Sequence, residues 1–291
     1  MATTVPAAFT ELQGRLALTP NQRTIAAGRL ANLQSFFAAN YTVATAPWAI
    51  GSYGRGTIVR PERDIDIMVA LSVPEYWARY EGDSRVFLRW LRDGLNRKYA
   101  NTKVGVRGIT VHLALGEDLE VDLVGGFHRK GGGFYIPNGS GGWQATNPPY
   151  HDKLMTDANV RTNSALKPLV RVMKAWNIMG NGGRLHSFHL EMMVERVWQK
   201  ATSLPAMPVA VTATLKTGAG WVRAAHPDPW TGSGQRLDSY LTATLRAAVA
   251  KTMDDDAVGA QAALDFVATG QTAKAFERWA IVFNHQFPAY G

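Results

Sequence analysis

Two aspartates and a nearby Gly-Ser pair carry the most informative chemistry in this sequence. Asp64 and Asp66 alternate with isoleucines in an apolar run that begins shortly after Gly51 and Ser52. Side chains alternate between the two faces of a strand, so the two carboxylates should point the same way. Neighbouring carboxylates repel each other and resist desolvation unless a cation lies between them. Hard divalent cations such as Mg²⁺ prefer carboxylate oxygens and share their other positions with substrate phosphates. The pattern predicts a phosphoryl-transfer site.

The glycine-rich segment upstream of these acids fits phosphate binding without matching the common nucleotide loops. Gly51 and Ser52 offer backbone N–H groups and a hydroxyl that can approach phosphates closely. Gly51, Gly56 and Thr57 have nearly P-loop spacing, but Gly56 stands where the P-loop lysine is required. The glycine order is also the reverse of a dinucleotide-binding loop. Both of these rival interpretations are excluded.

A second strand should supply a third carboxylate. Two-metal nucleotidyl transfer needs another acid to hold the second ion and activate the attacking hydroxyl. Asp122 lies between apolar residues, where an unpaired carboxylate would be costly, so we expect it to face a cation. Glu120 shares its face and is the fallback. The alternative for Asp122 is a surface acid on an edge strand.

The elements that must position these residues form a mixed pattern of strands and helices. Apolar spacing and turn residues predict strands over 44–50, 64–71, 108–115 and 119–124, the last two joined by Gly116-Glu117-Asp118. They predict helices over 19–40 and 74–99, then an irregular connector over 125–149. The remaining predicted helices cover 159–179, 187–200, 236–253, 255–269 and 271–283. The fold class is therefore α+β, with a small mixed sheet and a mostly helical C-terminal half.

We divide the chain into a catalytic core with an N-terminal spine helix (1–150) and a helical nucleotide-binding domain (151–291). The active site is expected in the cleft between them, with the first helix packed across both. A chain of 291 residues is long enough for this arrangement.

The bulk composition limits the remaining functional classes. The chain has no cysteine, which excludes disulfides and cysteine-ligated zinc. Neither a signal peptide nor a membrane span is expected, so we place the protein in the cytoplasm without a membrane partner. The net charge of +8 favours anionic partners such as nucleotides or polymers. The densest basic stretch, over 79–107, is interpreted as a solvated helix face in preference to a nucleic-acid surface.

The set Gly51-Ser52, Asp64-x-Asp66 and Asp122 resembles the polymerase β-like nucleotidyltransferases. Further segments narrow the resemblance to the CD-NTases, the bacterial relatives of cyclic GMP-AMP synthase in antiphage (CBASS) signalling. These segments are the opening helix, 174–177, 186–191, 228–229 and the closing stretch 279–288. The acid triad alone is specific only for the superfamily, whereas the combined pattern points to the clade.

This resemblance implies roles for the acids. Asp64 and Asp66 would hold two Mg²⁺ ions, with Mn²⁺ as a substitute, and Asp122 would complete the metal site. Gly51 and Ser52 would contact the donor triphosphate.

The resemblance also implies a phosphate-binding role for two residues of the C-terminal half. Lys174 would neutralise the β- and γ-phosphates and Ser187 would hydrogen-bond them. Lys174 interrupts an apolar helical pattern, so it must meet an anion or else extend to solvent. Phe188 would stack on a nucleobase or belong to the core.

The resulting hypothesis is an Mg²⁺-dependent ATP- and nucleotide-binding enzyme that joins nucleoside triphosphates into a cyclic di- or trinucleotide. The family's product is a second messenger that activates a downstream effector in antiviral defence, and a nucleic acid or protein can act as activator. One alternative is that the enzyme transfers a nucleotide to another acceptor, such as RNA, a small molecule or a protein. Another is a nucleic-acid sensor that uses the basic stretch and has a secondary transferase site.

Overall fold

The computed structural model describes residues 2–61, 64–100, 102–116 and 119–291, which form two compact units. The sheet unit spans Leu18–Gly56 and Glu62–Lys153, and the helical unit spans Met1–Ala17, Thr57–Pro61 and Leu154–Gly291. The sequence-based ranges 1–150 and 151–291 divide the chain once. The helical unit also includes two segments of the N-terminal half, namely the first helix and residues 57–61.

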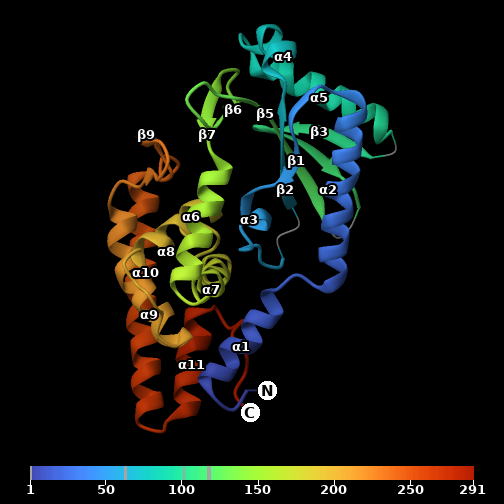
Figure 1. Cartoon of the computed structure of the whole chain (residues 1–291). Coiled ribbons are helices and arrows are strands. Elements are labelled where there is room, and N and C mark those ends of the chain that lie inside the picture. Colours follow the sequence, from blue (N-terminus) through green and yellow to red (C-terminus); the bar gives the residue numbers. More distant parts are fainter. Residues whose placement is uncertain (1, 62–63, 101, 117–118) are drawn as a thin grey trace. The chain divides into compact units, whose positions relative to one another are not determined.

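The sheet unit contains one mixed sheet with the order β1-β2-β5-β4-β3 (Figure 1). β2 and β5 are parallel, while the β1–β2, β5–β4 and β4–β3 pairs are antiparallel. β6 pairs with β5 beyond the stretch that pairs with β4, and β7 pairs with β6. The strands are β1 (Val43–Ala49), β2 (Asp64–Leu71), β3 (Lys103–Arg107), β4 (Thr110–Ala114), β5 (Glu120–His128), β6 (Phe134–Pro137) and β7 (Trp143–Thr146).

Helices α2 (Pro20–Asn40), α4 (Val73–Tyr80) and α5 (Ser84–Lys98) belong to the same unit, together with the single turn α3 (Gly51–Gly54). The prediction of a helix over 19–40 is confirmed: Thr19 and Gln22 form a reciprocal capping box. α5 packs on β5 at Gly125, where a Cβ would lie 2.4 Å from Leu91 Cδ1. The odd-numbered residues of β5 therefore face α5, and the even-numbered ones face the other side.

Two predictions for this unit are wrong. The single helix over 74–99 is two helices, because Asp83 caps a new helix by accepting from the backbone N–H of Arg85. The connector over 125–149 is not irregular throughout, since β5 continues to His128 and two short strands follow. Strand β3 was also not predicted. Of the predicted turn 116–118, Glu117 and Asp118 lie outside the described residues.

The helical unit has one large apolar core. An aromatic cluster joins its first and last helices: Phe9 meets Trp279 and Phe287 edge-on, each at a centroid distance of 4.9 Å. Such pairs add about 0.5–1.5 kcal/mol to the burial of their area. The hairpin of β8 (Pro227–Asp228) and β9 (Gly232–Arg236) belongs to the same unit. The helices are α1 (Val5–Leu16), α6 (Pro148–Arg161), α7 (Leu166–Met179), α8 (Ser187–Val197), α9 (Met207–Arg223), α10 (Ala243–Ala268) and α11 (Thr272–Val282).

Several predicted helix boundaries in this half are also wrong. The predicted helix 159–179 is interrupted where Asn163 and Ser164 adopt positive φ angles of 53° and 63°. The predicted helices 236–253 and 255–269 are one helix, α10, which begins at the Thr242 cap. Helices α1 and α9 were not predicted. The fold class itself, a small mixed sheet with a mostly helical C-terminal half, is confirmed.

We found no helix with the length and apolar character of a membrane span among the described residues.

Candidate active site

The predicted acids lie on one face of the sheet, on two adjacent parallel strands. Asp66 of β2 is in register with Asp122 of β5, and Asp64 is in register with Glu120. Neighbouring strands are about 4.8 Å apart, so each pair consists of close neighbours. Ile65 and Ile67, which alternate with the aspartates, are fully buried on the opposite face. The strand prediction for 64–71 is confirmed, and parallel pairing brings the Asp66 and Asp122 positions together.

Arg107, the last residue of β3, contacts two of these acids. Its Nη2 donates to Asp64 Oδ2 at 2.7 Å and also to Asp122 Oδ2. These hydrogen bonds, led by the one to Asp64, raise the pKa of the guanidinium above its usual value. A guanidinium thus relieves the repulsion between the carboxylates. Because the Arg107 side chain is 54% exposed, solvent screens both contacts.

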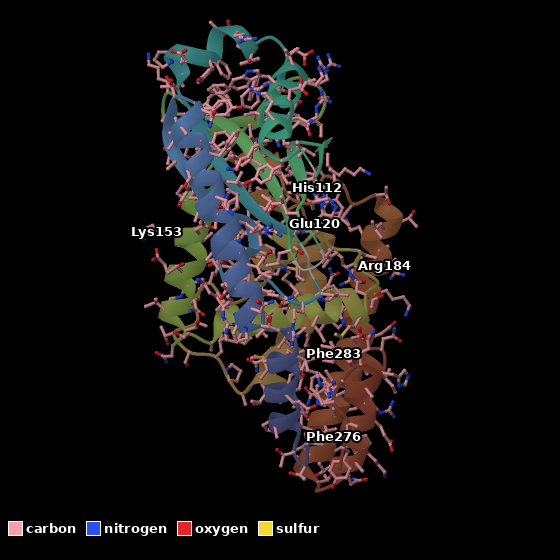
Figure 2. The ribbon with its side chains drawn as sticks, turned by 90° about the vertical axis from the view of Figure 1, so that its right-hand side faces the viewer. His112, Glu120, Lys153, Arg184, Phe276 and Phe283 are labelled. Atoms are coloured by element: carbon pink, nitrogen blue, oxygen red, sulfur yellow. The ribbon has the colours of Figure 1, made fainter. Side chains whose placement is uncertain are left out.

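Asp122 is held from its other side by β4. Its Oδ1 accepts from Thr110 Oγ1 at 3.2 Å and lies 2.9 Å from His112 Nδ1. The other ring nitrogen of His112 lies 3.0 Å from Glu120 Oε2 (Figure 2). Sequence reasoning missed both β4 residues, although the alternation Thr-Val-His could have placed them on one strand face. Asp122 Oδ1 is therefore engaged by protein groups, which leaves Oδ2 on the side of Arg107.

The donor set at this site has the chemistry of a divalent-cation site. Within the described part of the chain, no three His, Asp or Glu side chains converge closely enough to hold a metal ion as they stand. The acids nevertheless project from one face, and carboxylate oxygens are the ligands that Mg²⁺ prefers. Arg107 would have to swing away, which its exposed side chain permits. Asp64, Asp66 and Asp122 thus fit a cation, provided that the Arg107 side chain moves away from Asp64 and Asp122.

Gly51 is packed directly against Asp66. It has a φ of +62°, and a Cβ built on it would lie 1.9 Å from Asp66 Oδ2. The backbone N–H of Ile50 donates to the Asp66 carbonyl at 2.9 Å and fixes the start of α3 beside β2. Ser52 follows on this turn and is half-buried. Only glycine provides both the backbone angle and the space that Asp66 requires.

We expect Gly51→Ala to lower the rate of the phosphoryl transfer predicted for this site about a hundredfold, because the added methyl group displaces the Asp66 carboxylate by more than an ångström. Gly182→Ala is the matched control: Gly182 has a φ of +65°, but no atom lies within 4 Å of its Cβ position. Both variants have the same backbone strain, so turnover per folded molecule isolates the effect on Asp66. Equal turnover in the two variants would contradict a catalytic role for the Asp66 position.

Lys174 is enclosed in the helical unit. It lies in the middle of α7 and is only 1% exposed, and its Nζ donates to the Thr57 carbonyl at 3.3 Å. The same nitrogen is 3.8 Å from Oε1 of Glu191, which is fully buried on α8. Lys174 was expected either to meet an anion or to extend to solvent. In the structure it is buried, and an anion, the Glu191 carboxylate, lies beside it. A contact with phosphate would require Lys174 Nζ to leave these partners.

Ser187 and Phe188 begin helix α8. Ser187 is half-buried and stands one turn before Glu191, so the two residues share a helix face. That spacing is the signal in the sequence that could have linked Glu191 to Ser187. Phe188 is partly buried against the core of the helical unit, which matches the core alternative for this residue.

The basic stretch 79–107 does not form one helix face. Its residues are divided among α4, α5 and β3, which corrects the prediction of a single helical surface. Arg85 and Arg92 form ion pairs with Asp83 and Asp93, whereas Arg107 contacts the acids described above.

Residues 3–159 match the family described as the Second Messenger Oligonucleotide or Dinucleotide Synthetase domain. The chain is 23% identical over 272 residues to a probable cyclic nucleotide synthase of Bacillus cereus, covering 82% of this chain and 81% of the relative. It is 29% identical over 136 residues to a cyclic AMP-AMP-AMP synthase of an Acinetobacter strain, covering 43% and 37%.

Solved structures share the fold at low sequence identity. An Escherichia coli CdnC in complex with HORMA-deltaN has a TM-score of 0.77 and 18% identity, with 97% of each chain covered. Vibrio cholerae DncV, a cyclic AMP-GMP synthase bound to a linear intermediate, has a TM-score of 0.75 and 13% identity, with 99% of this chain and 97% of that one covered. The expected polymerase β-like nucleotidyltransferase fold is therefore confirmed.

Proposed function

Because the chain belongs to the second messenger oligonucleotide or dinucleotide synthetases, the CD-NTase family, we propose that it joins nucleoside triphosphates into a cyclic di- or trinucleotide. Family membership makes it a nucleotidyltransferase of the cyclic nucleotide synthase kind. In the proposed reaction a ribose hydroxyl attacks the α-phosphate of a second nucleotide, the bond to pyrophosphate breaks, and another round closes the ring. The observation that carries the proposal is the register that aligns Asp66 with Asp122 on the same sheet face as Asp64.

Three acids would hold the cations and orient the reacting groups. Two Mg²⁺ ions, or Mn²⁺ in their place, would stabilise charge on the attacking and leaving oxygens when bound. Asp64 and Asp66 supply carboxylates from one strand. Asp122 presents Oδ2 to the reacting groups, because Thr110 and His112 engage its Oδ1. His112 is thus a positioning residue that fixes the plane of the Asp122 carboxylate.

The triphosphate would be bound by residues outside the acid cluster. Gly51 and Ser52 offer backbone N–H groups and a hydroxyl at the turn beside Asp66, where oriented amides attract anions. We assign phosphate contacts to Lys174 and Ser187, and base stacking to Phe188. For Lys174 this assignment requires exchange of its contact with Glu191 for a phosphate.

The product would act as a second messenger for a separate effector in antiphage defence, as the family assignment suggests. The basic composition of the chain is consistent with anionic substrates. One structural relative is held in a complex with HORMA-deltaN, and we include a protein activator of this chain in the proposal on that ground. A nucleic-acid activator is the other partner that the test must include.

Incubation of the purified protein with labelled nucleoside triphosphates and Mg²⁺ or Mn²⁺ tests the proposed reaction. We expect phosphatase-resistant products whose masses equal those of cyclic di- or trinucleotides, formed without any primer. Mass spectrometry of reactions with all four nucleotides, alone and mixed, identifies the bases. Each reaction is repeated with added DNA, RNA and phage lysate to reveal an activator.

Two outcomes would replace the proposal. Extension of an added RNA primer, or labelling of a small molecule or protein, with no cyclic product would assign another acceptor to the same acids. Binding of nucleic acid that weakens steeply with salt, without turnover in any mixture, would indicate a sensor.

A further inference from the structure

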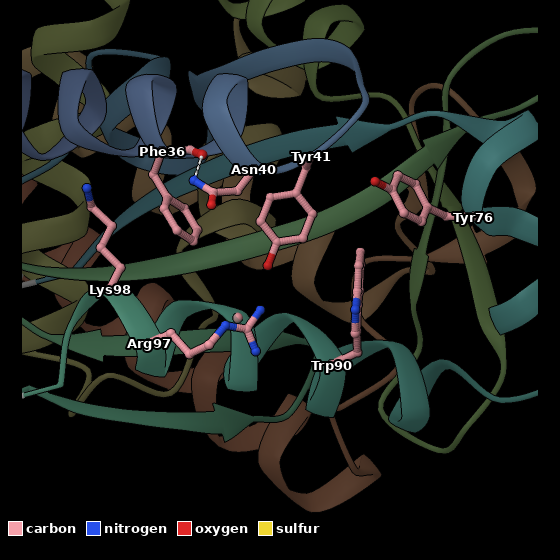
Figure 3. A pocket seen from close by; sticks show the side chains of 8 residues that line it. Phe36, Asn40, Tyr41, Tyr76, Trp90, Arg97 and Lys98 are labelled. Carbon is pink, nitrogen blue, oxygen red and sulfur yellow. Dashed lines mark hydrogen bonds between the residues drawn. The ribbon is translucent and has the colours of Figure 1, made fainter.

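A pocket lies in the sheet unit, on the side of the sheet away from the acids. It is formed by the end of α2, by α4 and by α5, and has a volume of about 340 Å³. α5 covers the β5 face that carries Gly125, whereas the acids project from the opposite face. The pocket is lined mainly by aromatic and basic side chains, namely Phe36, Tyr41, Tyr76, Trp90, Arg97 and Lys98 (Figure 3).

The aromatic rings form connected walls around this space. Trp90 meets Tyr41 edge-on at 5.2 Å and Tyr76 at 5.2 Å in a tilted arrangement. Trp90, Tyr41 and Tyr76 are each only half-buried, so ring surface stays accessible. Stacking of a nucleobase on an aromatic side chain is worth about 1–3 kcal/mol. The walls therefore suit a planar ring.

Two cations border the same pocket without a counter-ion. Arg97 and Lys98 are exposed in the last turn of α5, and neither forms an ion pair with any residue in the described ranges. Lys98 Nζ lies 5.3 Å from the centroid of the Phe36 ring. None of the described residues that line the pocket is acidic. The arrangement therefore offers positive charge beside aromatic surface.

Tyr41 adds a buried hydrogen-bonding group. Among the residues that the structure describes, its hydroxyl has no hydrogen-bond partner. Burial raises the pKa of this phenol, while the nearby Arg97 acts in the opposite direction. Gly94 makes room for it, since a Cβ there would lie 1.8 Å from the hydroxyl oxygen. Glycine within a helix costs about 1 kcal/mol of stability relative to alanine. Gly94 therefore lowers the stability of α5 slightly while leaving space for the Tyr41 hydroxyl.

We propose that this pocket binds a nucleoside monophosphate or the equivalent part of a larger nucleotide. The base lies against Trp90, Tyr41 and Tyr76, and the phosphate lies at Arg97 and Lys98. A volume of about 340 Å³ suits one nucleotide, since ligand pockets start at about 300 Å³. Because the acids are on the other face of the sheet, the pocket is a second nucleotide site and takes no part in phosphoryl transfer.

Calorimetric titration of the whole protein with AMP and with GMP tests this proposal. Nucleoside monophosphates have no pyrophosphate to release, so they bind without being consumed as donors. We expect Arg97→Gln with Lys98→Gln to weaken binding about tenfold or more, and Trp90→Leu to do the same through lost stacking. Arg89→Gln is the matched control: Arg89 is an exposed arginine of α5 that does not line the pocket.

Three results would overturn the proposal. One is unchanged affinity in the Arg97→Gln, Lys98→Gln protein, which leaves the core packing intact and so should fold normally. Another is equal affinity for inorganic phosphate and AMP, which would indicate a surface charge effect without base recognition. The third is loss of AMP binding in an Asp66→Asn protein, which would place the bound nucleotide at the acids. Adenosine alone should bind more weakly than AMP.

Discussion

Replacing Asp64 or Asp66 with asparagine should lower the formation of cyclic product by more than about a hundredfold. Changing residues behind the ligands of a metal site already costs about 10–100-fold, and removing a proposed ligand should cost more. The loss should be in turnover and not in folding. Asp64 pairs with a largely exposed arginine, and such surface pairs are worth about 0–1 kcal/mol. Rates from mass spectrometry, compared with thermal melts of the same variants, check both parts.

Three further variants show whether the loss of activity is specific to the proposed cation ligands. Asp93→Asn removes an exposed acid of α5 whose ion pair, among the described residues, is with its neighbour Arg92, and activity should be unchanged. Asp122→Asn should resemble Asp64→Asn, whereas Glu120→Gln should have a smaller effect, since Glu120 contacts His112 and is not one of the proposed cation ligands. Near-normal turnover in both the Asp64 and the Asp66 variant would rule out the proposed site. A larger loss for Glu120→Gln than for Asp122→Asn would exchange the roles of these two acids.

Lys174→Met should destabilise the helical unit by about 3–5 kcal/mol, because it removes one partner of a buried ion pair with the fully buried Glu191. Adding Glu191→Met should recover most of that loss, since a buried ion pair replaced by apolar groups of similar size is often neutral. Denaturant unfolding of wild type, both single variants and the double variant gives the coupling between the two residues.

Activity of the same four proteins separates packing from phosphate binding. If Lys174 contacts the triphosphate as proposed, the double variant will be stable yet will require a much higher triphosphate concentration for half-maximal rate. If the double variant regains both stability and wild-type kinetics, Lys174 serves only as the partner of Glu191. Lys167→Met is a suitable control, because Lys167 is half-buried at the start of α7 and its Nζ contacts the Thr156 hydroxyl.

The elements that were predicted well are those whose signals are local. β2 follows from the alternation of aspartate and isoleucine within one short run, and the start of α2 follows from Thr19, Pro20 and Gln22. The short strands β6 and β7 have little signal of their own, because each has only four residues and is stabilised by pairing with the strand before it. The break between α6 and α7 occurs at the exposed residues Asn163 and Ser164, whose positive φ angles the periodicity of apolar residues does not reveal.

The site residues likewise fall into those that the local sequence predicts and those that depend on strand pairing. Local alternation sufficed to place Asp64 and Asp66 on one strand face, and the cost of burying an acid among apolar residues singled out Asp122. Only the parallel register of β2 and β5 brings Asp122 beside Asp66. The contact of Arg107 with the acids depends on its place at the end of β3, where sequence reasoning expected a helix face.

By itself, the sequence determined the carboxylate chemistry and its strand, because residue type and period-two alternation are properties of neighbours in the chain. The tertiary structure decided which groups neutralise and orient those carboxylates. His112 and Arg107 reach Asp122 through strand pairing, and Glu191 reaches Lys174 through the packing of α7 and α8. Such contacts join residues separated along the chain, and no local pattern encodes the distance between them.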